Sequence, residues 1–358
     1  MAFLFYGGRG KIKKKSGNQL IFPAQNLFYK EKKIMKHIVI ITTGGTIAMK
    51  TDPETGGLVP AVSGEDLTAA VPLLSKYAEV ETVEFSNVPS GYVTPSDMFC
   101  LSLLIDEMAG KEEIDGFVIT HGTDTLEETA FFLDVTLKTK KPVCITGAMR
   151  GTSDPGSDGP ANILGAVRTA CTEEAGGMGV LVVLNDEIHA ARYVTKTHTT
   201  NPGTFQSPGW GPIGRIYGDR IVFGYRLQEG VKAYPDQIVP NVWLVKSVSG
   251  MDETMIRLAA ENYADGIVVE ALGCGNVSPD ERMGILYARS RGIPVVLTTR
   301  VPGGRVTEEY GYLGSASTMM DSGIILGGEL SGPKARLLLI AALGVTRDNE
   351  QLRDFFDR

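Results

Sequence analysis

The sequence GFVITHGTDTLEETA, at residues 116–130, contains the clearest junction between a strand and a helix in this chain. Its first four residues are apolar, as in a buried strand of a parallel sheet. Thr125, followed three residues later by Glu128, fits a capping box that opens a helix. The hydroxyl of Thr123 and the carboxylate of Asp124 are therefore predicted to lie at the carboxyl end of a strand, where α/β enzymes place their chemistry.

A second junction of this kind lies upstream, in the sequence HIVIITTGGTIA at residues 37–48. The paired glycines permit a tight turn with close backbone approach, and they present Thr46 on a loop. A glycine pair after a strand would by itself equally suit a phosphate-binding turn or a purely structural one. The presence of two turns that carry threonine favours a catalytic role for both.

The rest of the chain alternates between apolar runs and helical patterns, which indicates parallel sheets covered by helices. A hydroxyl residue followed by proline marks two helix starts, at Thr94 and Ser278. We predict an α/β protein with two domains, each a mostly parallel sheet flanked by helices, the N-terminal domain being the larger. Strands are expected at 37–43, 79–85, 115–120, 142–147, 178–184, 241–246, 266–271 and 294–299, and helices near 64–75, 95–109, 125–138, 160–175, 252–263, 279–291 and 333–344.

The domain boundaries follow from changes in composition. The first 35 residues mix lysines with aromatic residues and lack the long apolar core of a signal peptide. We therefore expect residues 1–35 to be a dispensable extension, either a mis-assigned upstream start or a disordered tail. Glycine and proline are frequent in residues 200–240. We predict a catalytic domain at residues 36–222, a linker at 223–240 and a C-terminal domain at 241–358.

Composition excludes several classes of protein. The chain has 358 residues, of which 43% are hydrophobic and 22% charged, enough to bury two cores. It contains no run of 18 apolar residues, so no membrane span is expected. The net charge of −7 argues against nucleic acid as a partner. The four cysteines lack the spacing of metal ligands, and neither a Walker motif nor a GxGxxG start is present, so we expect no metal and no cofactor.

Both threonine turns match known signatures. TGGTIA at Thr43–Ala48 and HGTDT at His121–Thr125 resemble the two signatures of the bacterial-type L-asparaginase/glutaminase family. The resemblance covers roughly residues 36 to 358. Further matches follow in the same order: GAMR at 147–150, DGP at 158–160, VTKTHTT at 194–200 and GCGN at 273–276.

Hydrolysis of a carboxamide requires a nucleophile, a group that moves its proton, and donors for the oxyanion. This chain offers threonine, carboxylate and lysine, with Thr46 as the candidate nucleophile and Thr123, Asp124 and Lys196 as a proton relay. Residue chemistry leaves open which threonine attacks; the resemblance implies that Thr46 forms the acyl intermediate and that Thr123 also lines the oxyanion site. A single lysine is more often solvated, and only the VTKTHTT context selects Lys196. His121 is interpreted as a structural turn residue.

An amino-acid substrate brings an ammonium, for which the carboxylate of Asp124 is suited. The resemblance implies that Ser90 contacts the substrate's α-groups and that Gly91 stands where relatives have a second polar residue. It also implies that Asn276 reaches the substrate of a neighbouring subunit. An obligate homo-oligomer follows, either a dimer or a dimer of dimers (a homotetramer).

The chain departs from the family pattern at the lid. Many members have a tyrosine there that helps to activate the nucleophile, whereas Lys50 to Val62 contains none. Tyr92 is a candidate replacement. The acid that pairs with this tyrosine would fall near Glu308 or Glu309. This departure concerns the rate and not the reaction type.

The resemblance implies an L-asparaginase, an amidohydrolase that converts L-asparagine to L-aspartate and ammonia. The absence of a recognisable signal and of the cysteine pair of extracytoplasmic relatives predicts a cytoplasmic protein. Two alternatives remain open: a glutaminase-type subunit of a tRNA-dependent amidotransferase, and a non-catalytic amino-acid-binding protein. The preference between asparagine and glutamine stays open, because one methylene is worth only about 1–3 kcal/mol of discrimination.

Overall fold

The computed structural model describes residues 35–45, 47, 49–51, 58–60, 66 and 69–357. Of the extension expected at residues 1–35, all but Met35 lies outside the described residues. Four residues of the helix expected near 64–75 also lie outside them. Of its described residues, Asp66 and Ala69 are α-helical, and the segment ends in a 3₁₀ helix, η2 (Pro72–Lys76), which has proline at its start.

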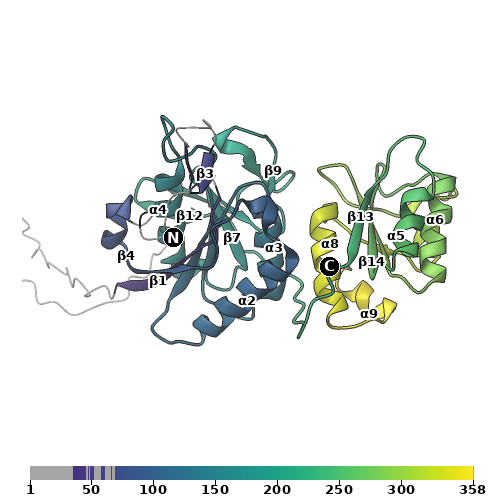
Figure 1. Ribbon diagram of the computed structural model, residues 1–358, viewed down its shortest axis with the longest axis horizontal. Helices are drawn as coiled ribbons and strands as arrows, with labels where there is room; N and C mark the ends of the chain where they lie inside the picture. The colour runs from purple at the N-terminus through teal and green to yellow at the C-terminus, as the bar shows by residue number, and fades with distance from the viewer. Residues whose placement is uncertain are drawn as a thin grey trace, which may run out of the picture. The chain divides into compact units, whose positions relative to one another are not determined.

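The chain forms two α/β domains, and the N-terminal domain contains an eight-stranded mixed sheet (Figure 1). Five neighbouring strands are parallel and three at one edge are antiparallel. The direction reverses after β7 because Asn185 and Asp186 both adopt positive φ, at 52° and 60°, as in a tight hairpin turn. In sheet order the strands are β12 (Arg220–Phe223), β11 (Gly214–Tyr217), β8 (Glu187–Ala190), β7 (Val180–Leu184), β6 (Val143–Thr146), β5 (Gly116–Thr120), β1 (Lys36–Thr42) and β4 (Ala78–Glu84).

Helices cover both faces of this sheet, as the alternation of side chains along each strand requires. In β5, Phe117 and Ile119 belong to the apolar cluster that includes α2 (Pro95–Ala109) and α3 (Leu126–Thr136). The intervening Val118 belongs to the cluster formed with α4 (Gly159–Ala170). Figure 1 accordingly shows α2 and α3 on one side of the sheet and α4 on the other.

The C-terminal domain contains a four-stranded parallel sheet with helices on both faces. One apolar cluster includes buried side chains of both α8 and α3, so the two domains share a core. In sheet order the strands are β13 (Val242–Lys246), β14 (Gly266–Ala271), β15 (Val295–Thr299) and β16 (Ile325–Leu326). The helices are α5 (Thr254–Glu261), α6 (Pro279–Ser290), α7 (Ala316–Met320), α8 (Gly332–Leu343) and α9 (Asn349–Asp354).

Short elements join these sheets and helices. Two small antiparallel pairs are present, and the second of them carries Lys196. The pairs are β2 (Met49–Thr51) with β3 (Leu58–Pro60) and β9 (Thr195–Lys196) with β10 (Phe205–Gln206), and the further 3₁₀ helices are η3 (Ser90–Tyr92), η4 (Glu173–Ala175) and η5 (Pro202–Thr204).

The helix starts agree with the sequence prediction at two positions and differ at one. Thr94 forms a capping box with Asp97, and the Ser278 side chain accepts a hydrogen bond from the backbone N–H of Glu281. Thr125 precedes α3 as expected, but the predicted capping box is wrong, because the Thr125 side chain makes no cap. Its hydroxyl donates instead to the backbone carbonyl of Ser90, at 2.8 Å. A tertiary contact has thus replaced a local one.

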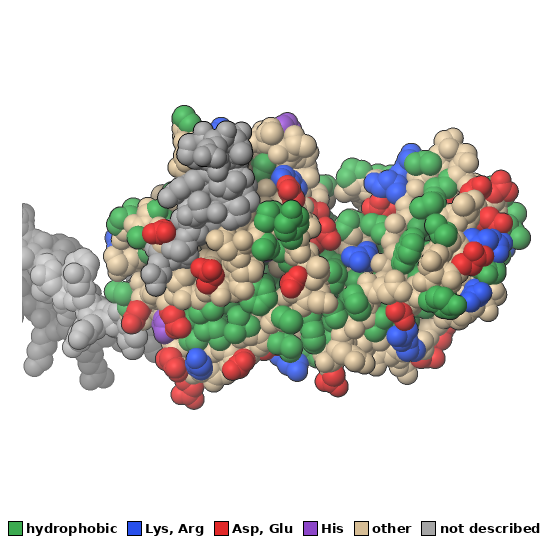
Figure 2. Space-filling model, viewed as in Figure 1, with side chains coloured by type: hydrophobic (Ala, Val, Ile, Leu, Met, Phe, Trp, Pro, Cys, Tyr) green, Lys and Arg blue, Asp and Glu red, His purple; other side chains and the backbone are tan. Residues whose placement is uncertain are grey.

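Charged side chains are well mixed on the face drawn in Figure 2, where acidic and basic groups alternate among the described residues without a continuous basic patch. Among the helices of the described part of the chain, none has the length and apolar character that crossing a membrane requires.

Candidate active site

The two threonine turns are packed against each other through glycines. Gly44 and Gly45 have φ values of 102° and 85°, which L-residues with side chains rarely adopt. A Cβ on Gly45 would lie 2.2 Å from the Cα of Gly122. The residue before Thr46 therefore touches the residue before Thr123. Thr46 itself lies outside the described residues.

Lys196 lies beside the second threonine turn. Its Nζ donates to Thr123 Oγ1 at 3.0 Å and to Asp124 Oδ1 at 2.7 Å. Thr123 is buried, and the side chain of Lys196 is 17% exposed, whereas that of Asp124 is 78% exposed. An open hollow of about 370 Å³ lies here, lined by Asp124, Glu127 and residues 196–199. The structure thus brings together three of the four predicted catalytic residues, and two of them, Asp124 and Lys196, line a space that solutes can enter.

The backbone that carries Lys196 is held by Glu127, a residue that sequence reasoning missed. Glu127 Oε2 accepts from the backbone N–H of Lys196 at 2.5 Å, and Oε1 accepts from Thr195 Oγ1 at 3.0 Å. Glu127 lies in the first turn of α3, directly after the HGTDT sequence. An acid so close to a candidate relay was a signal available in the sequence, although the partner it would bind was not.

His121 has a structural position, as expected. It is completely buried, and its Nδ1 is 2.8 Å from the carbonyl of Gly122. Its Nε2 is 2.9 Å from Thr129 Oγ1. The carbonyl can only accept, so Nδ1 carries the proton and Nε2 accepts from the threonine hydroxyl. Burial lowers the pKa of His121 to about 4, so the ring is neutral at pH 7.

The predicted substrate-binding loop lies next to the second turn. Ser90 is buried, and its Oγ is 2.7 Å from the point where a Cβ on Gly122 would be. Gly91 is exposed, and no atom lies within 4 Å of the position of a Cβ there. Tyr92, in the same 3₁₀ helix, is 73% exposed. Glu308 and Glu309 are exposed residues of the C-terminal domain.

Asn276 is not joined to the Lys196 group in this chain. It follows β14 in the C-terminal domain, where its backbone forms a β-bridge with Leu272. Its Nδ2 lies 3.7 Å from Cys274 Sγ. The side-chain oxygen is buried and has no hydrogen-bond partner among the described residues.

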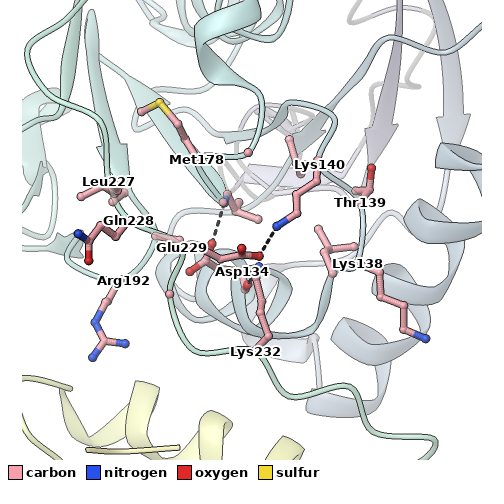
Figure 3. A pocket seen from close by; sticks show the side chains of 18 of the residues that line it. Asp134, Lys138, Thr139, Lys140, Met178, Arg192, Leu227, Gln228, Glu229 and Lys232 are labelled. Carbon is pink, nitrogen blue, oxygen red and sulfur yellow. Dashed lines mark hydrogen bonds and ion pairs between the residues drawn. The ribbon is translucent and has the colours of Figure 1, made fainter. Parts of the chain in front are cut away.

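A second pocket, of about 60 Å³, lies at the opposite end of the parallel strands, where β6 and β7 begin. Figure 3 shows side chains that line it. Lys140 there pairs with Glu229, and Lys232 donates to the backbone carbonyl of Asp134. Both contacts tie the segment after the N-terminal sheet to α3 and the loop that follows it. This pocket is therefore interpreted as part of the connection between the domains.

The fold, with polar groups gathered at the strand ends, defines a two-domain α/β enzyme. The family model "Asparaginase, N-terminal" matches residues 37–229, and "Glutaminase/Asparaginase C-terminal domain" matches residues 241–356. The chain therefore belongs to the asparaginase family, as the two signatures indicated.

Individual relatives agree with this assignment. The chain is 36% identical to L-asparaginase of Bacillus licheniformis, over 90% of this chain and 99% of the relative. It is also 36% identical to L-asparaginase 2 of Bacillus subtilis (strain 168), over 91% of this chain and 88% of the relative. The solved structure of "Probable Cytoplasmic L-asparaginase from Campylobacter jejuni" has a TM-score of 0.82 and 32% identity, covering 90% of this chain and 99% of that one.

Proposed function

We propose that this protein hydrolyses the side-chain amide of L-asparagine to L-aspartate and ammonia. The observation that carries the proposal is the ammonium of Lys196 within hydrogen-bonding distance of both the Thr123 hydroxyl and the Asp124 carboxylate. This group stands at the end of β5, beside the turn that precedes Thr46. The names of the relatives in Bacillus support the choice of asparagine as substrate.

In the proposed mechanism, Thr46 attacks the amide carbon and its proton passes to the leaving nitrogen. The C–N bond breaks, ammonia leaves, and an ester joins Thr46 to the aspartyl group. Water then cleaves this ester and returns a proton to Thr46. Lys196, Thr123 and Asp124 form the relay that carries these protons, because they make one hydrogen-bonded chain. Thr123 also faces the developing oxyanion.

We assign substrate binding to groups around the turn that carries Thr123. A carboxylate offers about four lone-pair sites, so Asp124 can accept from Lys196 and from a substrate ammonium together. Ser90 and the backbone N–H of Gly91 are proposed to contact the α-groups of the substrate. The closeness of Ser90 to Gly122, in the turn that carries Thr123, supports this assignment.

We also propose that the site is completed by a second copy of the chain, in a dimer or a dimer of dimers. The supporting observation is the buried oxygen of Asn276, which lacks a partner among the described residues. An active monomer in sizing chromatography coupled to an activity assay would refute this assembly. The proposed location is the cytoplasm, in line with the name of the relative in Campylobacter jejuni; cell fractionation tests it.

The decisive experiment measures ammonia release from L-asparagine, L-glutamine and D-asparagine, with Thr46→Val as the blank. Thr254→Val, at an exposed threonine at the start of α5 and outside the hollow, is the matched control. Release from L-asparagine that is lost in Thr46→Val and kept in Thr254→Val is the expected result. No release by folded protein would favour the alternatives: stimulation by tRNA would indicate an amidotransferase subunit, and tight asparagine binding without turnover a binding protein.

A further inference from the structure

Lys334 occupies an unusual place for a lysine. It lies in the first turn of α8, where the helix dipole disfavours a cation, and it is only 3% exposed. Burial lowers the pKa of Lys334 to about 8. A buried ammonium persists only where partners offset its desolvation. The partners of Lys334 therefore indicate what it does.

Those partners lie in the other domain. Lys334 Nζ donates to the backbone carbonyl of Val194 at 2.5 Å and to that of Arg192 at 3.2 Å. Both carbonyls belong to the segment that leads into β9 and Lys196. The acids facing Lys334 come from α3, namely Glu127, Glu128 and Asp134, and the opposing cation is Arg192.

Glu127 holds the same segment from its other end. It accepts from the Thr195 hydroxyl and from the Lys196 N–H. The sheet itself contributes little, because β9 has two residues and pairs only with the equally short β10. The two side chains thus hold the segment at residues 192–194 and at residues 195–196, the first from the C-terminal domain and the second from α3.

We propose that Lys334 and Glu127 are positioning residues, which fix the backbone at residues 192–196 and so hold the Lys196 ammonium against Thr123 and Asp124. This inference rests on the proposed function of Lys196 as part of the proton relay. Neither residue touches the reacting atoms. Because a misplacement of about 1 Å can cost roughly 100-fold in rate, loss of either anchor lowers kcat rather than substrate binding.

The experiment combines Lys334→Met and Glu127→Gln with Lys196→Met and measures kcat and KM for L-asparagine, using long incubations for the slow variants. Each single anchor variant should lower kcat by about 10- to 100-fold with KM changed by less than about threefold. In the Lys196→Met background, neither anchor substitution should lower kcat further. Lys334→Arg should recover most of the activity, because a hollow of about 260 Å³ borders Lys334.

The matched control is Lys141→Met. Lys141 also donates to a backbone carbonyl of the N-terminal domain, that of Lys111 at 2.6 Å, but this carbonyl lies between α2 and β5 and not in residues 192–196. Its kcat should stay near that of the unmodified enzyme. Thermal unfolding of every variant establishes that the protein is folded.

The outcomes of these experiments separate the two proposals. Unchanged kcat in folded Lys334→Met and Glu127→Gln overturns the inference, as does an equal loss of kcat with and without Lys196. If Lys334→Met does not fold, Glu127→Gln, alone and combined with Lys196→Met, carries the same test. Normal turnover in Lys196→Met alone refutes instead the proposed relay, so the two failures are distinguishable.

Discussion

The carboxyl ends of the strands differ between the two domains, although both domains are built from parallel strands and helices. In the N-terminal domain, Lys196 meets Thr123 and Asp124 beside an open hollow. In the C-terminal domain, the acid at the end of β14, Glu270, accepts from the backbone N–H of Gly332 at the start of α8 and pairs with Lys246. The strand ends thus carry the proposed proton relay in one domain and a helix cap in the other. Placement at a strand end is therefore not sufficient to define a site.

The sharpest test of this difference is to remove the cation from the N-terminal group. Lys196→Met should lower turnover by about 10²- to 10⁴-fold, the range expected for loss of a proton-transfer group. Lys246→Met, which removes the cation paired with Glu270, should leave turnover nearly unchanged. Ammonia release and thermal unfolding check both. Comparable losses in the two variants would contradict the assignment of chemistry to the first domain.

The second largest effect is expected from the contact between the two glycine turns. Gly45→Ala should lower the free energy of unfolding by about 2–6 kcal/mol, because it combines strain at positive φ with a clash against the backbone of Gly122. Gly218→Ala isolates the first cause, since its φ is 55° and no atom lies within 4 Å of a Cβ there. Its cost should be about 1–2 kcal/mol. Unfolding by denaturant measures the loss of stability in both variants. Equal losses in Gly45→Ala and Gly218→Ala would show that the contact between the two turns adds no stability.

Acid should destabilise the N-terminal site through His121. The folded pKa is about 4, below the ordinary value of 6.5, so between these pH values the unfolded chain binds a proton that the folded chain does not. Stability therefore falls as pH drops through this window, by about 3 kcal/mol for this residue. His121→Gln should remove that component. The free energy of unfolding of both proteins at pH 7 and pH 4.5 tests this prediction. An identical pH dependence in His121→Gln would show that His121 does not cause the loss of stability in acid.

Helix caps should give the smallest effects and compare the domains directly. Thr94→Ala, at the start of α2, should cost about 1 kcal/mol through loss of the capping box. Ser278→Ala, at the start of α6, should cost more, because the Ser278 hydroxyl also donates to the carbonyl of Met251 at 2.8 Å. Chemical denaturation measures both. The reverse order would show that the cap in the C-terminal domain adds no tertiary connection.

Much of this arrangement could be predicted from the sequence, because apolar runs and caps act locally. The structure places strands and helices within a few residues of most expected segments, including β5 and α3 on either side of Thr123. The antiparallel edge of the first sheet was not anticipated, since it depends on the left-handed conformation of Asn185 and Asp186. Glu127 was not selected either, because its partners lie almost 70 positions away in the chain.

The sequence by itself determined the family, the two-domain α/β class and the threonine turns, because glycine pairs, hydroxyl caps and apolar periodicity act over a few neighbouring residues. Only the tertiary structure decided that the Thr125 hydroxyl binds Ser90 instead of capping its helix, and that Lys334 reaches across to the Lys196 segment. The reason is physical. A buried hydrogen bond or charge needs a partner in space, and the chain fold alone determines which distant residue supplies it.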